Sequence, residues 1–232
     1  MSDGQFNFRG AVQRIVSHGG FAGAIFLVEP LNSAFGNLIK VKLNANVQSN
    51  VPVLGEVWEI TGCYDDDTTY GEQIIADEAF PVLPSGHVLV DFIGKNPKFA
   101  GIGIRTAQKM WMAFGEELYD ILTQQKEDRL LSKIKLNGTL LEILFETWKE
   151  YEQVIPVVRF FHSLGFNARL ANKAVEFWGN ETIEKVKEDP YRLLAFGNWG
   201  RVDAAARKML NVSNDAEIRL IASVEEALVH SA

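Results

Sequence analysis

Residues that build metal sites, disulfides and membrane spans are scarce in this sequence. Its 232 residues include one cysteine, Cys63, and four scattered histidines, which excludes an internal disulfide and a cysteine-based zinc site. The longest uncharged stretch, 15–28, is far shorter than the ~20 apolar residues of a membrane span. Residues 1–5 lack the basic start of a signal peptide. We expect a cytoplasmic protein that contacts no membrane and holds no metal ion.

Positive charge is also scarce in the first part of the chain. The net charge is −7, with four lysines and arginines against ten aspartates and glutamates in residues 1–90, and 19 against 20 in the remainder. This excess of acid weakens any expectation of a broad basic surface for nucleic acid. Hydrophobic residues make up 47% of the chain, which is enough for one or two compact units.

The first part has the pattern of β-structure. Five short runs rich in Val, Ile and Phe are separated by turn-forming residues, and one of them, 38–43, shows the period of two most clearly, with Ile39, Val41 and Leu43 inward and both lysines outward. The runs are 6–17, 22–29, 38–43, 56–64 and 72–80. Five strands predict a small OB-like barrel over residues 1–84 rather than an immunoglobulin-type sandwich, with an SH3-like barrel as the alternative.

The barrel region holds candidates for binding. An OB face can bind single strands through aromatic and basic side chains, but here we interpret the aromatic residues as core. The run Asp65-Asp66-Asp67 is interpreted as a hairpin tip rather than a magnesium cluster, because adjacent residues of an extended chain point apart. The aromatic and basic candidates are Phe8, Phe21, Phe26 and Trp58 with Arg9, Arg14, Lys40 and Lys42.

The second part contains an internal duplication. Residues 101–109 align with 165–173 at an offset of 64, and each copy is followed by an aromatic-glycine pair. A weaker turn follows in each copy, at 136–138 and at 198–204. The four turns share the template G-h-G-x-x-x-A, where h is apolar. They predict an α+β fold in which the barrel is followed by two all-helical domains, 88–155 and 156–232.

This template is that of a helix-hairpin-helix motif. Its glycines allow a tight turn between two helices and a close approach of bare backbone, and its alanine allows close helix packing. The turn exposes backbone amides at a helix N-terminus, which bind phosphate without basic side chains. The motif therefore predicts sequence-independent DNA binding even in an acidic chain.

The four copies differ in quality. The first is complete, and we predict that it binds DNA phosphate through Gly101, Gly103, Arg105, Thr106, Lys98 and Lys109. The second, with Leu136 and Glu142 in place of the first glycine and the alanine, is assigned a structural role. The third and fourth have asparagine in place of one glycine, which left-handed backbone tolerates. Their weaker candidates are Gly165, Asn167, Arg169, Asn198, Gly200 and Arg201.

These features resemble the amino-terminal region of long RecD-type DNA helicases, the exodeoxyribonuclease V alpha subunits. The most specific marks are the turn Gly165-Phe166 and the segment 189–194, Asp-Pro-Tyr-Arg-Leu-Leu, whereas the barrel is matched mainly by pattern. The resemblance implies a role in DNA repair and recombination beside a motor domain that binds ATP and magnesium. The degenerate second hairpin, Asn167 and Asn198 depart from the family pattern.

The motor itself is not encoded in this sequence. No G-x-x-x-x-G-K-[ST] loop occurs, and no Ser/His/Asp, Cys/His or paired-carboxylate arrangement stands out. We therefore expect no ATPase activity and no cofactor in this chain. The last helical segment, 218–229, suggests a sequence truncated before the motor or a natural protein that has lost it.

Three functions fit these observations. The first is an accessory module of a helicase that binds DNA and orients its own motor. The second is a DNA-junction binder similar to RuvA, which also joins an OB barrel to tandem hairpins. The third is a docking module for protein subunits, which the acidic charge favours. A salt series distinguishes them, because phosphate contacts weaken steeply as salt rises.

Overall fold

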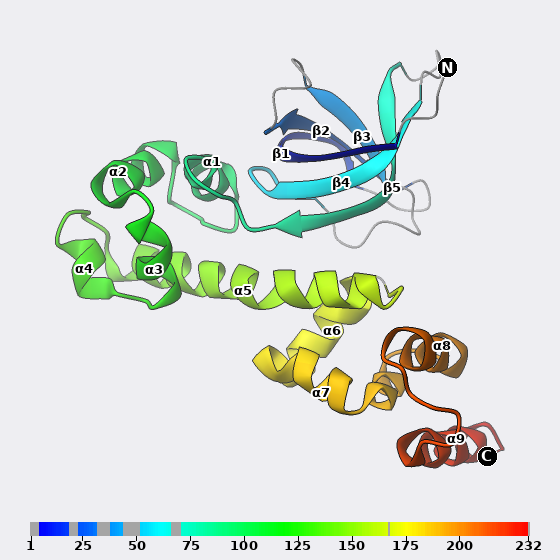
Figure 1. Ribbon diagram of the computed structural model, residues 1–232. Helices are drawn as coiled ribbons and strands as arrows, with labels where there is room; N and C mark the ends of the chain where they lie inside the picture. Colours follow the sequence, from blue (N-terminus) through cyan, green and yellow to red (C-terminus); the bar gives the residue numbers. More distant parts are fainter. Residues whose placement is uncertain are drawn as a thin grey trace. The chain divides into compact units, whose positions relative to one another are not determined.

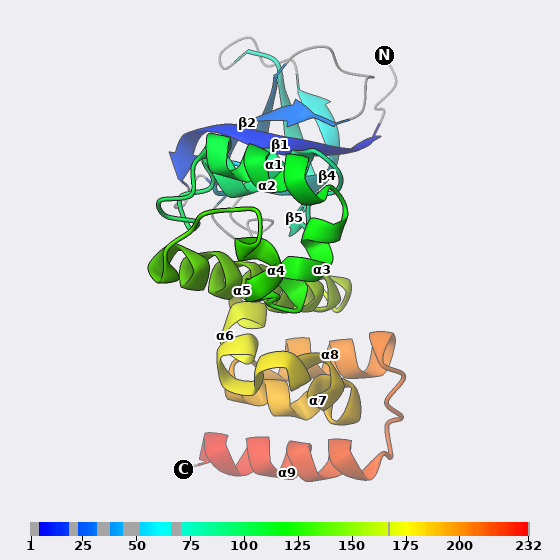
Figure 2. The same ribbon diagram turned by 90° about the vertical axis from the view of Figure 1, so that its left-hand side faces the viewer.

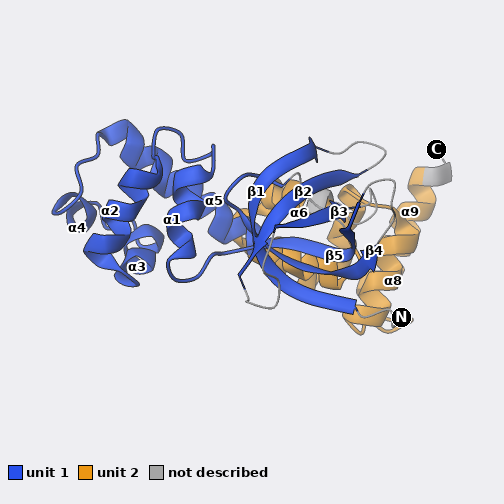
Figure 3. Ribbon diagram, turned by 90° about the horizontal axis from the view of Figure 1, so that it is seen from above, with its two compact units in different colours: residues 1–155 blue, residues 156–232 orange. Residues whose placement is uncertain are grey.

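The computed structural model describes residues 5–18, 23–31, 38–43, 52–65, 71–166 and 168–231. The chain divides into two compact units, 1–155 and 156–232, which Figure 3 shows in separate colours. The boundary falls within one long helix, at Pro156, whose missing N–H removes one hydrogen bond from that helix. Each unit is described by itself below.

Five strands at the start of the first unit form a closed barrel (Figure 1). Strand β1 closes it, because one half of β1 pairs with β2 and the other half with β4. The order is β1-β2-β3-β5-β4, with β3 and β5 parallel and the other pairs antiparallel. The strands are β1 (Gln5–His18), β2 (Ala24–Pro30), β3 (Ile39–Leu43), β4 (Val57–Asp65) and β5 (Gln73–Val82). The five predicted strands and the OB-like barrel are confirmed.

The barrel core holds the aromatic residues that were candidates for binding. Phe8, Phe26 and Trp58 are at most 3% exposed, and the rings of Phe26 and Trp58 lie 5.8 Å apart. Their interpretation as core is confirmed, while Phe21, Asp66 and Asp67 lie outside the described residues. Arg9, one of the basic candidates, forms an ion pair with Glu59 at 2.8 Å.

Helices complete the first unit. They are α1 (Val88–Lys95), α2 (Ile104–Phe114), α3 (Glu117–Thr123), α4 (Glu127–Leu131) and α5 (Gly138–Ser163), of which the part up to Ile155 belongs to this unit. Their core is rich in aromatic rings around Phe92, whose centroid lies 4.9 Å from Tyr151 and 6.3 Å from Trp148. Helix α1 therefore packs against α5 as well as against α2.

The second unit is entirely helical in its described part. After the end of α5 it contains α6 (Ala168–Trp178), η1 (Gly179–Glu181), α7 (Thr182–Glu188), η2 (Pro190–Ala195), α8 (Trp199–Met209) and α9 (Glu217–Ser231). Figure 2 shows α6, α7 and α8 grouped together, with α9 along one side of the group. No strand follows Val82 in the residues that the structure describes, so the predicted segregation of barrel and helices is confirmed.

Candidate nucleic-acid interface

The internal duplication is present in the backbone. Helices α2 and α6 each have 11 residues and begin 64 residues apart. The glycines before them have matching left-handed backbone, with φ of 81° at Gly101 and 78° at Gly165. The glycines after them match as well, at 53° for Gly115 and 56° for Gly179. The predicted repeat is therefore confirmed, and helix α5 is long because it ends the first hairpin pair and begins the second.

The first hairpin, between α1 and α2, leaves backbone donors uncovered. Gly103 is the N-cap of α2 and offers no side chain to the helix, and its carbonyl accepts from the N–H groups of Thr106 and Ala107 at 2.9 and 3.1 Å. Within the described chain no acceptor is recorded for the N–H groups of Gly103, Ile104 or Arg105. A helix N-terminus with uncapped amides attracts an anion.

Packing holds this hairpin in shape as the template requires. Ile102 and Ala107 are buried, at 2% and 1% exposed. A Cβ on Gly103 would meet nothing within 4 Å, so this part of the turn faces open space. A Cβ on Gly94, in α1, would lie 2.6 Å from the Cα of Ile104. Sequence reasoning missed Gly94, although a lone glycine in an otherwise apolar helix was a usable signal for close helix contact.

The predicted cations of the first hairpin have different surroundings. Arg105 and Lys109 are exposed, and no ion pair is recorded for either among the described residues. Lys98 instead binds Glu150, with 2.6 Å from Nζ to Oε1, and lies over the Tyr151 ring at 4.9 Å. The charge of Lys98 is therefore already balanced, whereas Arg105 and Lys109 remain available to an anion.

A buried polar network fixes the loop of this hairpin to the barrel. The Tyr151 hydroxyl donates to Glu56 and accepts from the side-chain NH2 of Asn96, each at 2.8 Å. The side-chain oxygen of Asn96 accepts from the backbone N–H of Lys98 at 3.0 Å. Glu56 also accepts from the indole of Trp58 at 2.9 Å. Burial raises the pKa of Glu56 although these donors oppose the shift. The network was not foreseen, because its members lie far apart in the sequence.

The second hairpin, between α4 and α5, has a side-chain cap at the start of α5. The side chain of Asn137 accepts from the N–H of Leu140 at 2.9 Å, and its carbonyl accepts from Leu141 at 3.0 Å. Asn137 therefore takes the place of Gly103, and Gly138 is the first residue of α5. The predicted alignment of this copy was wrong by one position, because asparagine rather than glycine is the better helix cap.

The third hairpin, between α5 and α6, resembles the first in its turn. Gly165 donates to His162 and Phe166 donates to Phe161, each at 2.9 Å, which ends α5 with left-handed backbone at Gly165. Phe166 and Ala171 are buried at 6% and 0% exposed, as the template predicts for its apolar residue and its alanine. Asn167 and the side chain of Arg169 lie outside the described part of the structure.

The fourth hairpin precedes α8. Asn198 is its N-cap and accepts from the N–H of Arg201 at 3.1 Å. The predicted alignment was wrong by two positions here: Gly200 lies inside α8, Ala204 is exposed, and Val202 is the buried residue that packs. Arg201, one of the weaker candidates for DNA binding, is exposed.

The segment 189–194 is structural. Asp189 caps η2 by accepting from the N–H of Tyr191 at 3.0 Å, and the Tyr191 hydroxyl donates to Asp203 at 2.8 Å. Asp203 also binds Arg219 of α9, with 2.8 Å from Nε to Oδ1. Hydrogen bonds from Arg219 hold the pKa of Asp203 below its usual range. This network fastens η2, α8 and α9 together.

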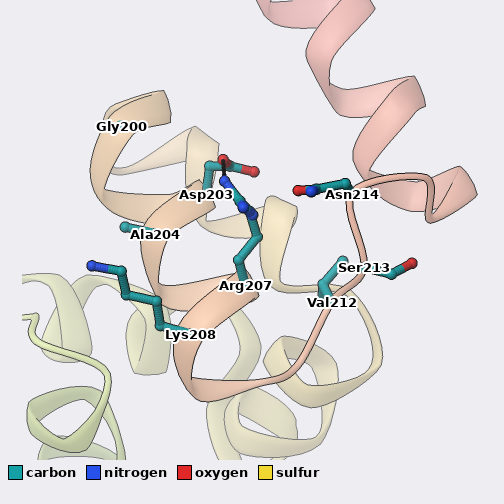
Figure 4. A pocket seen from close by; sticks show the side chains of 8 residues that line it. All are labelled: Gly200, Asp203, Ala204, Arg207, Lys208, Val212, Ser213 and Asn214. Atoms are coloured by element: carbon teal, nitrogen blue, oxygen red, sulfur yellow. Dashed lines mark ion pairs between the residues drawn. The ribbon is translucent and has the colours of Figure 1, made fainter.

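Two open pockets lie in the second unit. One, of about 490 Å³, runs along α8 (Figure 4). In it Arg207 points toward Asp203, with 3.9 Å between the charged atoms, while Lys208 points away. The other, of about 290 Å³, joins Phe166 of the third hairpin to Phe196 of the fourth and includes Lys173 and Arg201. The pocket along α8 contains the carboxylate of Asp203, and the pocket between the third and fourth hairpins contains none. The latter pocket is therefore better suited to an anion.

The comparison with protein families finds a match in the second part of the chain. Residues 150–232 match a family described as the HHH, or helix-hairpin-helix, domain of the ATP-dependent RecD2 DNA helicase. The match covers the end of α5 and the elements that follow it, and does not reach the barrel or the first hairpin. No curated protein matches the chain. None of the helices in the described residues is long and apolar enough to cross a membrane.

Proposed function

We propose that this chain is an accessory region of a RecD2-type DNA helicase that binds DNA phosphates through its first hairpin, because residues 150–232 match the helix-hairpin-helix domain of that family. In this proposal the N–H groups of Gly103, Ile104 and Arg105 contact one phosphate, and Arg105 and Lys109 add positive charge beside it. Such contacts position DNA without reading its sequence. ATP and magnesium belong to the helicase motor, for which this sequence has no phosphate-binding loop.

The uncapped N-terminus of α2 is the observation that carries the proposal. The N-termini of α5 and α8 are capped by Asn137 and Asn198, whose side chains accept from their own helices. At α2 the cap is Gly103, which has no side chain to do this and has open space around it. With no cap side chain over the turn, the N–H groups of Gly103, Ile104 and Arg105 are open to a phosphate.

The acidic net charge is compatible with this site. The carboxylate Glu150 neutralises Lys98 at the hairpin, but no acidic partner is recorded for Arg105 or Lys109 in the described chain. Beyond about 10 Å at ordinary ionic strength, the acids of the barrel are largely screened. Local amides and two cations therefore determine the interaction.

The proposal is tested by measuring affinity for a short duplex from about 50 to 200 mM salt. We expect a steep decrease in affinity for the complete chain. Arg105→Ala should weaken binding to all sequences and reduce the salt slope by about one. Lys126→Ala serves as the control. It removes an exposed cation at the N-terminal end of α4, and we expect little change in affinity.

Two results would contradict the proposal. The first is an affinity that does not depend on salt, and the second is an equal effect of Arg105→Ala and Lys126→Ala. A preference for a four-way junction over a duplex of equal length would instead favour the junction-binding alternative.

A second candidate function, docking of a protein, is favoured by α9. This helix exposes a row of apolar side chains, each at least half exposed, at Leu220, Ile221, Val224 and Leu228. Such a row marks a protein contact, and the motor of a RecD2-type helicase is the partner that the family match suggests. We expect Val224→Asp to abolish capture of such a motor domain while leaving duplex affinity unchanged. Equal capture by both forms would exclude α9 as the docking site.

A further inference from the structure

Three aromatic side chains form a cluster on the surface of the second unit. Phe177 and Trp178 end α6, and Phe196 begins the fourth hairpin. Their ring centroids lie 5.4–6.1 Å apart, with each pair roughly edge to face. Phe177 is 75% exposed, and the other two are partly exposed. A large ring left this open in water costs free energy unless a partner covers it.

The cluster is continuous with a positively charged pocket. Phe196 belongs to both, because it also lines the pocket of about 290 Å³ between the third and fourth hairpins. Lys173 and Arg201 line the same pocket, and both are exposed. No acidic partner is recorded for either within the described residues. Aromatic rings and unpaired cations thus meet at one place.

The duplication shows that two of these three rings are not part of the shared repeat pattern. The positions that correspond to Phe177 and Phe196 in the first repeat are Ala113 and Lys135, by the 64-residue offset and by alignment of the caps Asn137 and Asn198. The first repeat forms α2, a helix of the same length as α6, with alanine at the position of Phe177. The position of Trp178 is Phe114 in the first repeat, where the ring is buried at 7% exposed. In the described residues, a ring as exposed as that of Phe177 therefore occurs in the second repeat and not at the corresponding place in the first.

We propose that the cluster Phe177, Trp178 and Phe196 stacks against an unpaired base of single-stranded nucleic acid, whose phosphates lie against Lys173 and Arg201. Rings that stack bases beside cations that hold the backbone are the usual means of binding a single strand without sequence preference. A purely apolar protein surface would leave the two cations uncompensated. The inference deepens the proposed DNA-binding function but concerns the other compact unit, so the two can be tested separately.

The test compares two single strands bound by the complete chain. One is oligothymidine of ~15 nucleotides, and the other is an abasic strand of equal length, which keeps the phosphates but has no bases. We expect the unmodified chain to bind oligothymidine at least tenfold more tightly. Phe177→Ala should reduce this ratio about tenfold, and Phe177→Leu should reduce it nearly as much, because leucine restores apolar area without a ring. Lys173→Ala should weaken both strands equally.

Matched controls separate stacking from loss of fold and from loss of the first hairpin. Met112→Ala removes a side chain that is 79% exposed on the equivalent helix α2 and should leave the ratio unchanged. Arg105→Ala should lower duplex affinity and also leave the ratio unchanged. If it fails to lower duplex affinity while Phe177→Ala still changes the ratio, the first-hairpin proposal is wrong and the stacking site stands.

The inference is overturned by equal affinity for the two strands, or by a ratio that Phe177→Ala leaves unchanged. It is also overturned if Phe177→Leu retains the full ratio, because the cluster would then act as apolar area, as expected for contact with a protein. Oligothymidine should quench tryptophan fluorescence less in Trp178→Phe than in the unmodified chain. Undiminished quenching in this variant would also overturn the inference, because the base would then stack elsewhere.

Discussion

The two hairpin pairs have the same backbone plan and different surfaces. Both contain an 11-residue helix bounded by glycines with left-handed backbone. The first pair exposes the bare turn at Gly103, whereas the second exposes the ring of Phe177. Turn geometry is thus what the duplication retained, since the fold needs it. The exposed positions differ, as the proposals of phosphate binding by one pair and base stacking by the other require.

The two pairs are also anchored differently. The loop of the first pair is fastened to the barrel through the buried groups Glu56, Tyr151 and Asn96. The second pair is fastened within its own helices by Asp203, which binds Tyr191 and Arg219. Burial raises the pKa of the first anchor, Glu56, whereas hydrogen bonds from Arg219 lower the pKa of the second, Asp203. The two units should therefore respond in opposite ways to pH.

The largest expected effect comes from adding a methyl group where α1 and α2 are in close contact. In Gly94→Ala the new Cβ would lie 2.6 Å from the Cα of Ile104, and a backbone atom cannot move aside as a side chain can. We expect the first unit to lose about 3 kcal/mol of unfolding free energy, in line with overpacking of a core. Urea unfolding followed by tryptophan fluorescence measures this.

Gly138→Ala is the control for that substitution, because a Cβ there would meet nothing within 4 Å. It should be neutral or slightly stabilising, as expected for alanine in the first turn of a helix. Equal loss from both variants would show that α1 and α2 are not in the close contact described.

A smaller effect is expected from Asp203→Asn in the second unit. The change removes the negative charge that Arg219 and the Tyr191 hydroxyl share, at a position that is 8% exposed. Hydrogen bonds to a charged group support a loss of about 2 kcal/mol. Glu188→Gln removes a surface ion pair of the same unit and should cost less than about 0.5 kcal/mol.

The pH dependence of that anchor follows from the lowered pKa of Asp203. Its contribution is complete above the pKa of an unfolded aspartate, about 3.9, and is lost as the pH falls through the lower value of the folded state. Lowering the pH below 4 should therefore reduce the unfolding free energy of the second unit more in the unmodified chain than in Asp203→Asn. An equal loss of unfolding free energy with falling pH in the two proteins would show that Asp203 is not the anchor.

The smallest effect is expected from Glu56→Gln in the first unit. Because burial raises the pKa of Glu56, its stabilising contribution is present below the pKa of an unfolded glutamate, about 4.3, and is lost as the pH rises through the folded value. Glutamine is neutral at every pH; its amide oxygen can accept from Trp58, and its NH2 group can donate to the Tyr151 oxygen instead of accepting from that hydroxyl. We expect stability within about 1 kcal/mol of the unmodified chain and a flatter pH profile above pH 4.

Alternating side chains and the internal repeat were sufficient to predict the architecture. The alternation in 38–43 placed Val41 and Leu43 inward, and both are buried. The offset of 64 residues located α2 and α6, because a duplicated turn keeps its glycines. These signals are local, so a sequence shows them directly.

The details that sequence reasoning missed depend on contacts across the fold. The caps Asn137 and Asn198 were misplaced because the glycine template gave weight to Gly138 and Gly200, while a side chain that accepts from its own helix decides where a helix begins. The pairing of Lys98 with Glu150 joins residues far apart in the chain. Neither glycine spacing nor net charge contains that information.

The most direct test of phosphate binding by bare amides is a measurement of backbone N–H chemical shifts while duplex DNA is added. We expect the largest changes at Gly103, Ile104 and Arg105, whose N–H groups would gain a phosphate oxygen. The N–H of Leu140, already bonded to Asn137, should change little. Larger changes at Leu140 than at Gly103, or changes confined to the barrel, would contradict the assignment of the first hairpin as the DNA contact.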